Sequence, residues 1–141
     1  MILLDTNVVS EPLRPAPNAQ VIAWIDAQAL ETLYLSAITV AELRAGVAQL
    51  PAGKRRDALH DGLETQVLPL FAGRVRPFDL ACTQAYAALM AEARAAGRAI
   101  SPADGYIAAI AKANGFLVAS RDTGPFEAAD VGVINPWQIT P

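Results

Sequence analysis

Four acidic residues occur at positions in the chain that suit metal-assisted hydrolysis by carboxylates. Asp5 and Asp122 follow short apolar runs, whereas Glu42 and Asp104 lie near the starts of two helical segments. Carboxylates crowded into one site raise each other's pKa values unless a cation is present, and Mg²⁺ prefers oxygen ligands. A divalent ion held there activates water and stabilises the charge that develops in phosphodiester hydrolysis. This acidic quartet therefore indicates a metal-dependent hydrolase of phosphate esters.

Two of the acids also have a structural explanation as helix caps. Thr39 and Glu42 fit the capping-box pattern, with Thr39 as the N-cap. Ser101 and Asp104 fit the acidic variant of the same pattern. A capping role does not exclude a metal role, so both remain open for Glu42 and Asp104.

The other two acids have an explanation as turn residues. Asp5 begins the segment Asp5-Thr6-Asn7, and Asp122 lies in the segment Arg121-Asp122-Thr123-Gly124. Both segments contain residue types that favour turns. The metal interpretation is favoured because all four acids occur at the same end of successive elements. Ligands of open α/β sheets bind beyond the carboxyl ends of the strands.

The elements that must position these acids alternate between apolar runs and helical patterns. We expect parallel strands at residues 1–4, 33–35 and 116–119, with shorter ones at 75–78 and 131–134. Pro77 confines the 75–78 segment to a sheet edge or a strand end. Helical spacing predicts helices at residues 18–28, 40–49, 54–67, 79–96 and 103–114. The sequence therefore predicts an α/β fold in a single domain covering residues 1–141.

The overall charge does not favour binding to nucleic acid. With 11 Lys and Arg against 14 Asp and Glu, the net charge is −3, so an RNA-binding role needs local basic patches or metal ions. The candidates for contact with an RNA backbone are Arg14, Arg44 and Arg121, together with the run Lys54-Arg55-Arg56. That run is also explained as the solvated start of a helix.

Other classes of protein are disfavoured by composition. The longest uncharged runs are too short to span a bilayer, and the first residues lack the basic segment of a signal peptide, so we expect no membrane contact and a cytoplasmic location. Cys82 is the single cysteine and is expected to be a buried packing residue. His60 is the single histidine, and without a His or Cys cluster a zinc site is improbable.

Four segments of the chain resemble the motifs of one family, the PIN-domain ribonuclease toxins of the VapC type, and especially the FitB-like subgroup. The order and spacing of these motifs make the resemblance specific, although each string alone is weak. The end of the chain, Val133-Ile134-Asn135-Pro136-Trp137, is similar too. The four motifs are Met1-Ile2-Leu3-Leu4-Asp5-Thr6-Asn7, Leu35-Ser36-Ala37-Ile38-Thr39-Val40-Ala41-Glu42-Leu43, Ile100-Ser101-Pro102-Ala103-Asp104-Gly105-Tyr106-Ile107-Ala108 and Ala119-Ser120-Arg121-Asp122-Thr123.

This resemblance implies a three-layer α/β/α PIN domain with a central, mostly parallel sheet, and a Mg²⁺- or Mn²⁺-dependent endoribonuclease. The acidic quartet Asp5, Glu42, Asp104 and Asp122 matches the family's catalytic acids. We expect Asp5 and Asp104 to be the most direct metal ligands. Glu42 and Asp122 are expected to bind through water or to orient the attacking water.

The resemblance also implies supporting residues and partners. Thr6, Asn7 and Ser120 are expected to support the site, with Ser120 standing where many relatives have Thr, another hydroxyl. The implied partners are an RNA substrate, a second copy of the chain in a homodimer, and a cognate antitoxin. DNA is expected to be bound only through that antitoxin, as in a type II toxin–antitoxin system.

Two other functions remain as alternatives. A magnesium phosphohydrolase of the haloacid-dehalogenase type also places an Asp after its first strand, but it requires a second Asp where this chain has Asn7. A non-catalytic PIN-like module that only binds a partner would be favoured by loss of one quartet acid, and none is lost.

Overall fold

The sheet of this protein is parallel throughout and has its first strand at the centre. The computed structural model describes residues 1–139, so the last two residues of the predicted domain lie outside the described range. All four strand pairings are parallel. In the sheet order β3-β2-β1-β4-β5, the strands are β1 (Ile2–Leu4), β2 (Leu33–Ser36), β3 (Val75–Arg76), β4 (Leu117–Ala119) and β5 (Val133–Ile134).

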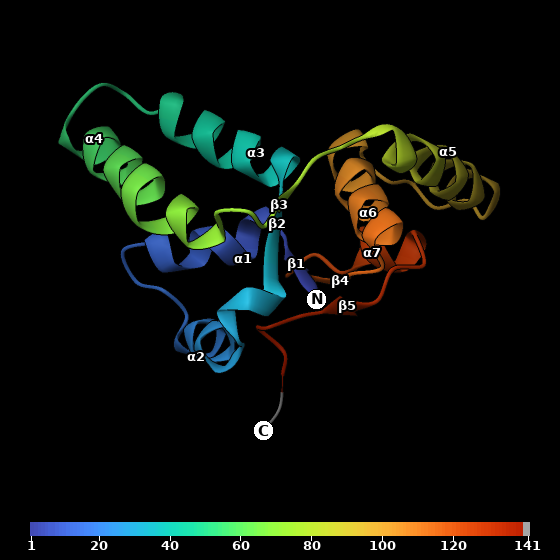
Figure 1. The fold of residues 1–141 in the computed structure, drawn as a ribbon, viewed down its shortest axis with the longest axis horizontal. Helices are drawn as coiled ribbons and strands as arrows, with labels where there is room; N and C mark the ends of the chain where they lie inside the picture. The colour runs from blue at the N-terminus through green and yellow to red at the C-terminus, as the bar shows by residue number, and fades with distance from the viewer. Residues whose placement is uncertain (140–141) are drawn as a thin grey trace.

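Helices cover both faces of this sheet. Figure 1 shows α1, α3 and α4 on one side and α5, α6 and α7 on the other, which confirms the predicted α/β/α layering. No helix among residues 1–139 has both the length and the hydropathy needed to cross a bilayer. The helices are α1 (Thr6–Ser10), α2 (Ala19–Ala27), α3 (Ala37–Ala48), α4 (Lys54–Asp61), α5 (Leu80–Ala95), α6 (Pro102–Asn114) and α7 (Gly124–Ala128).

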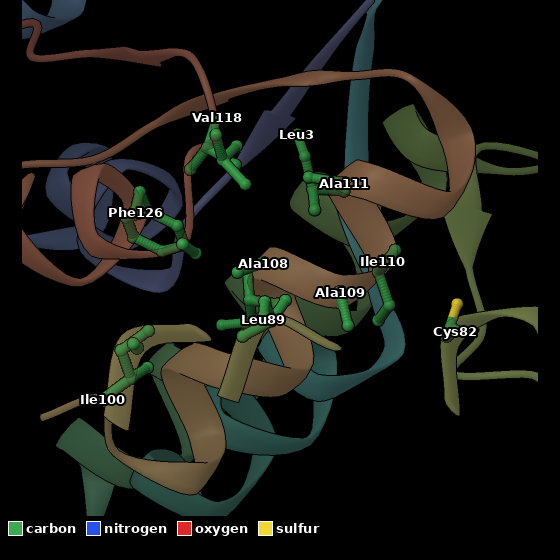
Figure 2. Close-up of a cluster of buried hydrophobic side chains, with 14 residues drawn as sticks. Leu3, Cys82, Leu89, Ile100, Ala108, Ala109, Ile110, Ala111, Val118 and Phe126 are labelled. Carbon is green, nitrogen blue, oxygen red and sulfur yellow. The ribbon is translucent and has the colours of Figure 1, made fainter. Parts of the chain in front are cut away.

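Alternation along the strands builds one hydrophobic core on each face. Successive side chains of a strand point to opposite faces, so Leu3 and Val118 join the core under α5, α6 and α7, whereas Leu4 and Ala119 join the core under α1 and α3. Figure 2 shows the first of these cores, with Leu3 and Val118 facing the helical side chains. Cys82 is fully buried in the same core, as expected.

The boundaries differ from the predicted ones mainly at the sheet edges and in one helix. The edge strands β3 and β5 each have two residues, and Pro77 directly follows β3 at the sheet edge, as predicted. The segment predicted as one helix at 54–67 is α-helical to Asp61 and continues as a π-helix over Gly62–Val67. Pro69 lacks the N–H that would bond to the carbonyl of Thr65, so a regular α-helix cannot continue through it.

Two short helices, α1 and α7, were predicted only as turns. Each has five residues, which is too short for helical periodicity to be visible in the sequence. Both begin close to acids of the quartet, since α1 follows Asp5 directly and α7 begins two residues after Asp122. The local chemistry at these positions is therefore that of helix starts.

Two leucines on α5 provide a matched test of the core. Leu89 is 1% exposed and Leu80 is 84% exposed. Leu89→Ala should lower the free energy of unfolding by about 2–5 kcal/mol, because it leaves a cavity, whereas Leu80→Ala should change it by less than about 0.5 kcal/mol. Urea denaturation measures both. Equal losses for the two variants would contradict this packing.

Candidate active site

Asp5 lies at the carboxyl end of the central strand and is held there by the backbone. Its N–H donates to the carbonyl of Ala119 on β4 at 2.9 Å, and its Oδ1 accepts the N–H of Thr6 at 2.8 Å. It is the N-cap of α1, and its side chain is buried. The first predicted ligand is therefore fixed between strand and helix.

Glu42 is brought toward Asp5 by α3. The expectation that Thr39 caps this helix is wrong, because the helix begins earlier, at Ala37, and Ser36 is the N-cap whose hydroxyl accepts the Thr39 N–H at 3.0 Å. Glu42 consequently lies beyond the first turn. Its Oε1 accepts a hydrogen bond from the Thr6 hydroxyl at 2.8 Å, which links it to the residue after Asp5.

Asp104 is placed by the cap of α6, as the sequence predicted. The Ser101 hydroxyl accepts the Asp104 N–H at 3.3 Å and lies 2.9 Å from Asp104 Oδ2, to which it donates. Pro102 occupies the first helical position. An N–H at this position has no acceptor within the helix, so the N–H that proline lacks costs no helical hydrogen bond. The cap thus fixes Asp104 in the first turn.

Ser120 connects the two strand ends beneath the acids. Its buried hydroxyl donates to Asp5 Oδ2 at 2.7 Å and accepts from the side-chain amide of Asn7 at 3.2 Å. The backbone N–H of Asp122 also donates to it, at 3.1 Å, and Asn7 Oδ1 accepts the Arg121 N–H at 3.1 Å. These contacts tie the loop that carries Asp122 to the start of α1.

The electrostatics of the site centre on Asp5. Burial raises the pKa of its carboxyl above the ordinary value of 3.8, and the hydrogen bonds from Ser120 and Thr6 oppose that shift. The negative charges of Asp104 and Glu42 raise the pKa further. Glu42 and Asp104, from two separate helices, therefore lie close enough to Asp5 for their charges to act on it.

Asp122 stands apart from this group. Its charge is not one of the causes of the Asp5 shift, and its side chain is exposed. The structure thus brings Asp5, Glu42 and Asp104 together electrostatically and brings Asp122 to the same loop through its backbone.

The donor set suits a hard divalent cation. Within residues 1–139, no three His, Cys, Asp or Glu side chains are already gathered as a metal site. Asp5 is nevertheless a buried carboxylate with acidic neighbours, and none of the ion pairs found in this part of the chain involves it. A cation bound beside such a carboxylate stabilises its ionised form, and oxygen ligands of this kind suit Mg²⁺ or Mn²⁺.

Two of the predicted RNA-contacting arginines are engaged within the protein. Arg44 donates to both carboxylate oxygens of Glu64, at 2.8 and 3.1 Å, and this pairing lowers the pKa of Glu64. The guanidinium of Arg121 lies 5.2 Å from the centre of the Trp137 ring. Arg121 stays exposed beside the Asp122 loop, whereas Arg44 is held toward Glu64.

The third arginine has a buried partner that the sequence reasoning missed. Arg14 Nη1 donates to Glu11 Oε1 at 3.0 Å, and Glu11 is 2% exposed. A second oxygen of Glu11 accepts the N–H of Asn18, the N-cap of α2, at 3.3 Å. The three-residue spacing of Glu11 and Arg14 could have indicated an ion pair from the sequence. The burial of Glu11 next to a Pro-rich stretch could not have been predicted in this way.

Comparison with known proteins identifies the family. The PIN domain family matches residues 2–132, nearly all of the chain. The chain belongs to the PIN-domain family. The quartet predicted from the sequence lies wholly within the matched residues of this PIN domain.

Close relatives cover almost the full length of the PIN domain. It is 68% identical over 138 residues to the plasmid stability protein StbB of Pseudomonas syringae pv. tomato, and 62% identical over 138 residues to the VapC ribonuclease Y4jK of Sinorhizobium fredii. It is 60% identical over 137 residues to the toxin FitB of Neisseria gonorrhoeae. At least 97% of this chain and 99% of each relative are covered.

Solved structures give the same result for the fold. FitAcB from Neisseria gonorrhoeae matches with a TM-score of 0.96 at 59% identity, covering 99% of this chain and 100% of the matched chain. FitAB bound to the IR36 DNA fragment matches with a TM-score of 0.97 at 57% identity, covering 100% and 99%. The fold of this PIN domain is therefore that of the matched chains in these two structures.

The raised pKa of Asp5 predicts a stability effect. Because the folded protein holds the Asp5 proton more tightly than the unfolded chain, ionisation lowers the free energy of unfolding as pH rises above 3.8 and through the folded pKa. Near neutral pH in EDTA, Asp5→Asn should raise Tm by a few degrees. Mg²⁺ should raise the Tm of the wild type and not of this variant. Differential scanning calorimetry measures both effects.

A matched control is Asp26→Asn, which neutralises an exposed acid on α2 and should leave Tm and its response to Mg²⁺ unchanged. A lower Tm for Asp5→Asn in EDTA, or an equal response of both variants to Mg²⁺, would contradict this electrostatic account.

Proposed function

We propose that this chain, as one PIN domain, is a divalent-metal-dependent endoribonuclease and the toxin of a toxin–antitoxin pair. The observation that carries the proposal is the coupling of Asp5, Glu42 and Asp104 around a buried carboxylate at the end of the central strand. Such a cluster suits a metal-assisted hydrolysis of phosphodiesters.

In this mechanism Asp5 and Asp104 hold the cation, which when bound supplies Lewis-acid stabilisation of the phosphate and a more acidic water. The Ser120 hydroxyl and the Thr6 N–H donate to different oxygens of Asp5 and so fix the plane of its carboxylate. Pre-organised groups of this kind need little rearrangement during the reaction.

Glu42 and Asp122 act on the attacking water. The Thr6 hydroxyl fixes Glu42 Oε1, and the other oxygen of this exposed carboxylate would accept the hydrogen bond from the attacking water. Asp122 lies on the loop that Ser120 and Asn7 tie to α1, so its exposed side chain faces solvent at the same end of the sheet.

The names of the relatives support RNA as the substrate. One relative at 62% identity is a VapC ribonuclease and another at 60% is a toxin, and both match this chain over nearly all of its length. The net-negative protein repels the phosphates of RNA unless a cation offsets the acidic residues, and the proposed metal ion has this role.

The partners follow from the same relatives. The FitAcB and FitAB structures each contain a chain like this one, and FitAB is bound to a DNA fragment. We propose a cognate antitoxin that blocks this toxin and carries the contact with DNA, a homodimer of the toxin, and a cytoplasmic location shared with the RNA.

The alternatives have less support. A haloacid-dehalogenase phosphohydrolase needs a second Asp at the position of Asn7, whose side chain here bonds to Ser120 and to the Arg121 N–H. Membership of the PIN family also argues against that reading. The experiment below distinguishes a ribonuclease from a PIN-like module that only binds a partner.

The test is RNA cleavage by the purified protein, free of antitoxin. We expect total bacterial RNA to give discrete products in Mg²⁺ and in Mn²⁺ and none in EDTA. Asp5→Asn and Asp104→Asn should each reduce cleavage by at least about 100-fold, since each removes a ligand charge. Gel analysis with mapping of the cut ends measures the products.

The control is Asp26→Asn, which should cut at the wild-type rate, with circular dichroism showing that all variants are folded. Cleavage that persists in EDTA, or in Asp5→Asn, would overturn the metal mechanism. Absence of any cleavage by a folded, metal-bound wild type would favour the binding module.

Ser120 gives a finer prediction. Ser120→Ala removes the donor to Asp5 Oδ2 and should lower the cleavage rate about 10- to 100-fold, the usual effect of losing a hydrogen bond that orients a metal ligand. Ser120→Thr keeps the hydroxyl and should retain most activity. Wild-type rates for Ser120→Ala would show that Asp5 needs no such support.

A further inference from the structure

The segment that follows β5 lies against the loop that follows β4. The Ser120 N–H donates to the carbonyl of Ile134 at 2.9 Å, so these two segments leave the sheet side by side at the edge that holds the acids. The Asn135 side chain donates to the carbonyl of Arg121 at 3.4 Å. Both backbone polar groups of Arg121 are therefore bonded to side chains, since its N–H donates to Asn7.

Trp137 is the residue of this segment that reaches the side chain of Arg121. Its N–H donates to Asn135 Oδ1 at 2.9 Å, and the Gln138 N–H donates to the Asn135 carbonyl at 3.1 Å, which closes a turn with Pro136 at its second position. The half-buried Trp137 ring packs against the core under α1 and α3, and the chain beyond it passes α2 (Figure 1). Turn and core together hold the ring in place.

The guanidinium of Arg121 lies over this ring and keeps its charge available. It is 5.2 Å from the ring centre, within the range of about 6 Å over which a cation is attracted to an aromatic face. Within residues 1–139, no acid forms an ion pair with Arg121, and its side chain is exposed. A guanidinium has five N–H donors in a planar fork, which suits the oxygens of a phosphate.

Arg121 differs in this respect from the other two arginines expected to contact RNA. Arg14 and Arg44 each form an ion pair with a glutamate, which offsets their charge. Arg121 instead directly follows Ser120, whose hydroxyl donates to Asp5 at 2.7 Å. It therefore brings a cation without an acidic partner to the edge of the sheet where the acids lie.

We propose that Arg121 binds a phosphate of the RNA strand beside the acidic cluster, and that Trp137 is the residue that positions Arg121 for this contact. This inference rests on the proposed ribonuclease function. Stacking on the ring restricts the guanidinium and leaves its N–H edge free for a phosphate. RNA is favoured over an acidic protein partner because Arg121 adjoins Asp122 of the quartet, and because a net charge of −3 makes local cations necessary for RNA.

The test is fluorescence anisotropy with a labelled, random-sequence, single-stranded RNA in Mg²⁺, in the Asp5→Asn background so that the RNA stays intact. Arg121→Ala should weaken binding about three- to tenfold and reduce the slope of log affinity against log salt by about 0.7, since one phosphate contact is lost. Trp137→Leu keeps an apolar side chain but removes the ring, and should weaken binding about two- to fivefold. Trp137→Phe restores a ring and should recover most of the affinity.

Two matched controls separate these effects from general ones. Arg94→Ala removes an exposed arginine from α5, on the other side of the sheet, and should leave RNA affinity unchanged. Trp24→Leu removes a tryptophan of α2 that packs against the same core as Trp137, and should also leave it unchanged. Equal losses for Trp24→Leu and Trp137→Leu would overturn the positioning role.

A double-mutant cycle tests whether Trp137 acts through Arg121. In the Arg121→Ala background, Trp137→Leu should cause no further loss of RNA affinity. A loss of equal size in both backgrounds would show that Trp137 acts on the fold alone and would contradict the proposal.

The remaining outcomes separate this inference from the function on which it rests. If Arg121→Ala binds RNA as the Arg94→Ala control does, Arg121 is not a phosphate contact, even if the wild type cuts RNA. If Arg121→Ala and Trp137→Leu lose affinity while the wild type cuts nothing, the proposed contact stands and the ribonuclease proposal fails.

Discussion

The burial of one carboxylate at the end of the central strand is the constraint on which the rest of the site depends. Asp5 is 6% exposed, its pKa is raised by burial, and the nearby charges of Glu42 and Asp104 add to the shift. A group in this position destabilises the fold when it is ionised without a cation. The protein keeps it there with hydrogen bonds from Ser120 and Thr6, which favour the charged form. The fold is thus less stable locally at a carboxylate whose neighbours are also acidic, and this is the arrangement that we propose to bind a metal ion.

The topology explains why these groups meet. In a parallel sheet all carboxyl ends lie at one edge, and with β1 at the centre its neighbours β2 and β4 carry the following segments to either side of Asp5. The helix after β2 supplies Glu42, and the loop after β4 supplies Ser120 and Asp122. Asp104 comes from the start of α6, on the opposite layer. The candidate active site is therefore assembled from both helical layers across the edge of one sheet.

Much of this arrangement was visible in the sequence, because apolar runs and helical periodicity are signals of many residues together. The five strands, the long helices and the cap formed by Ser101 were predicted in this way. Thr39 was mistaken for a cap because Ser36, three residues earlier, offers the same hydroxyl, and only the packing of the strand end decides between them. The pair of Arg44 with Glu64 depends on which faces of two helical segments meet, so local pattern could not reveal it. The pair of Glu11 with Arg14 is local, but the burial of Glu11 is set by tertiary packing.

The central claim is that Asp5 holds a divalent cation at this edge of the sheet. The most direct measurement is anomalous diffraction from crystals of the protein soaked in Mn²⁺, with crystals of Asp5→Asn treated in the same way. We expect an anomalous peak at bonding distance from the Asp5 carboxylate in the wild type and no peak there in the variant. A peak that persists at this position in Asp5→Asn, or Mn²⁺ bound only at sites away from Asp5, would contradict it.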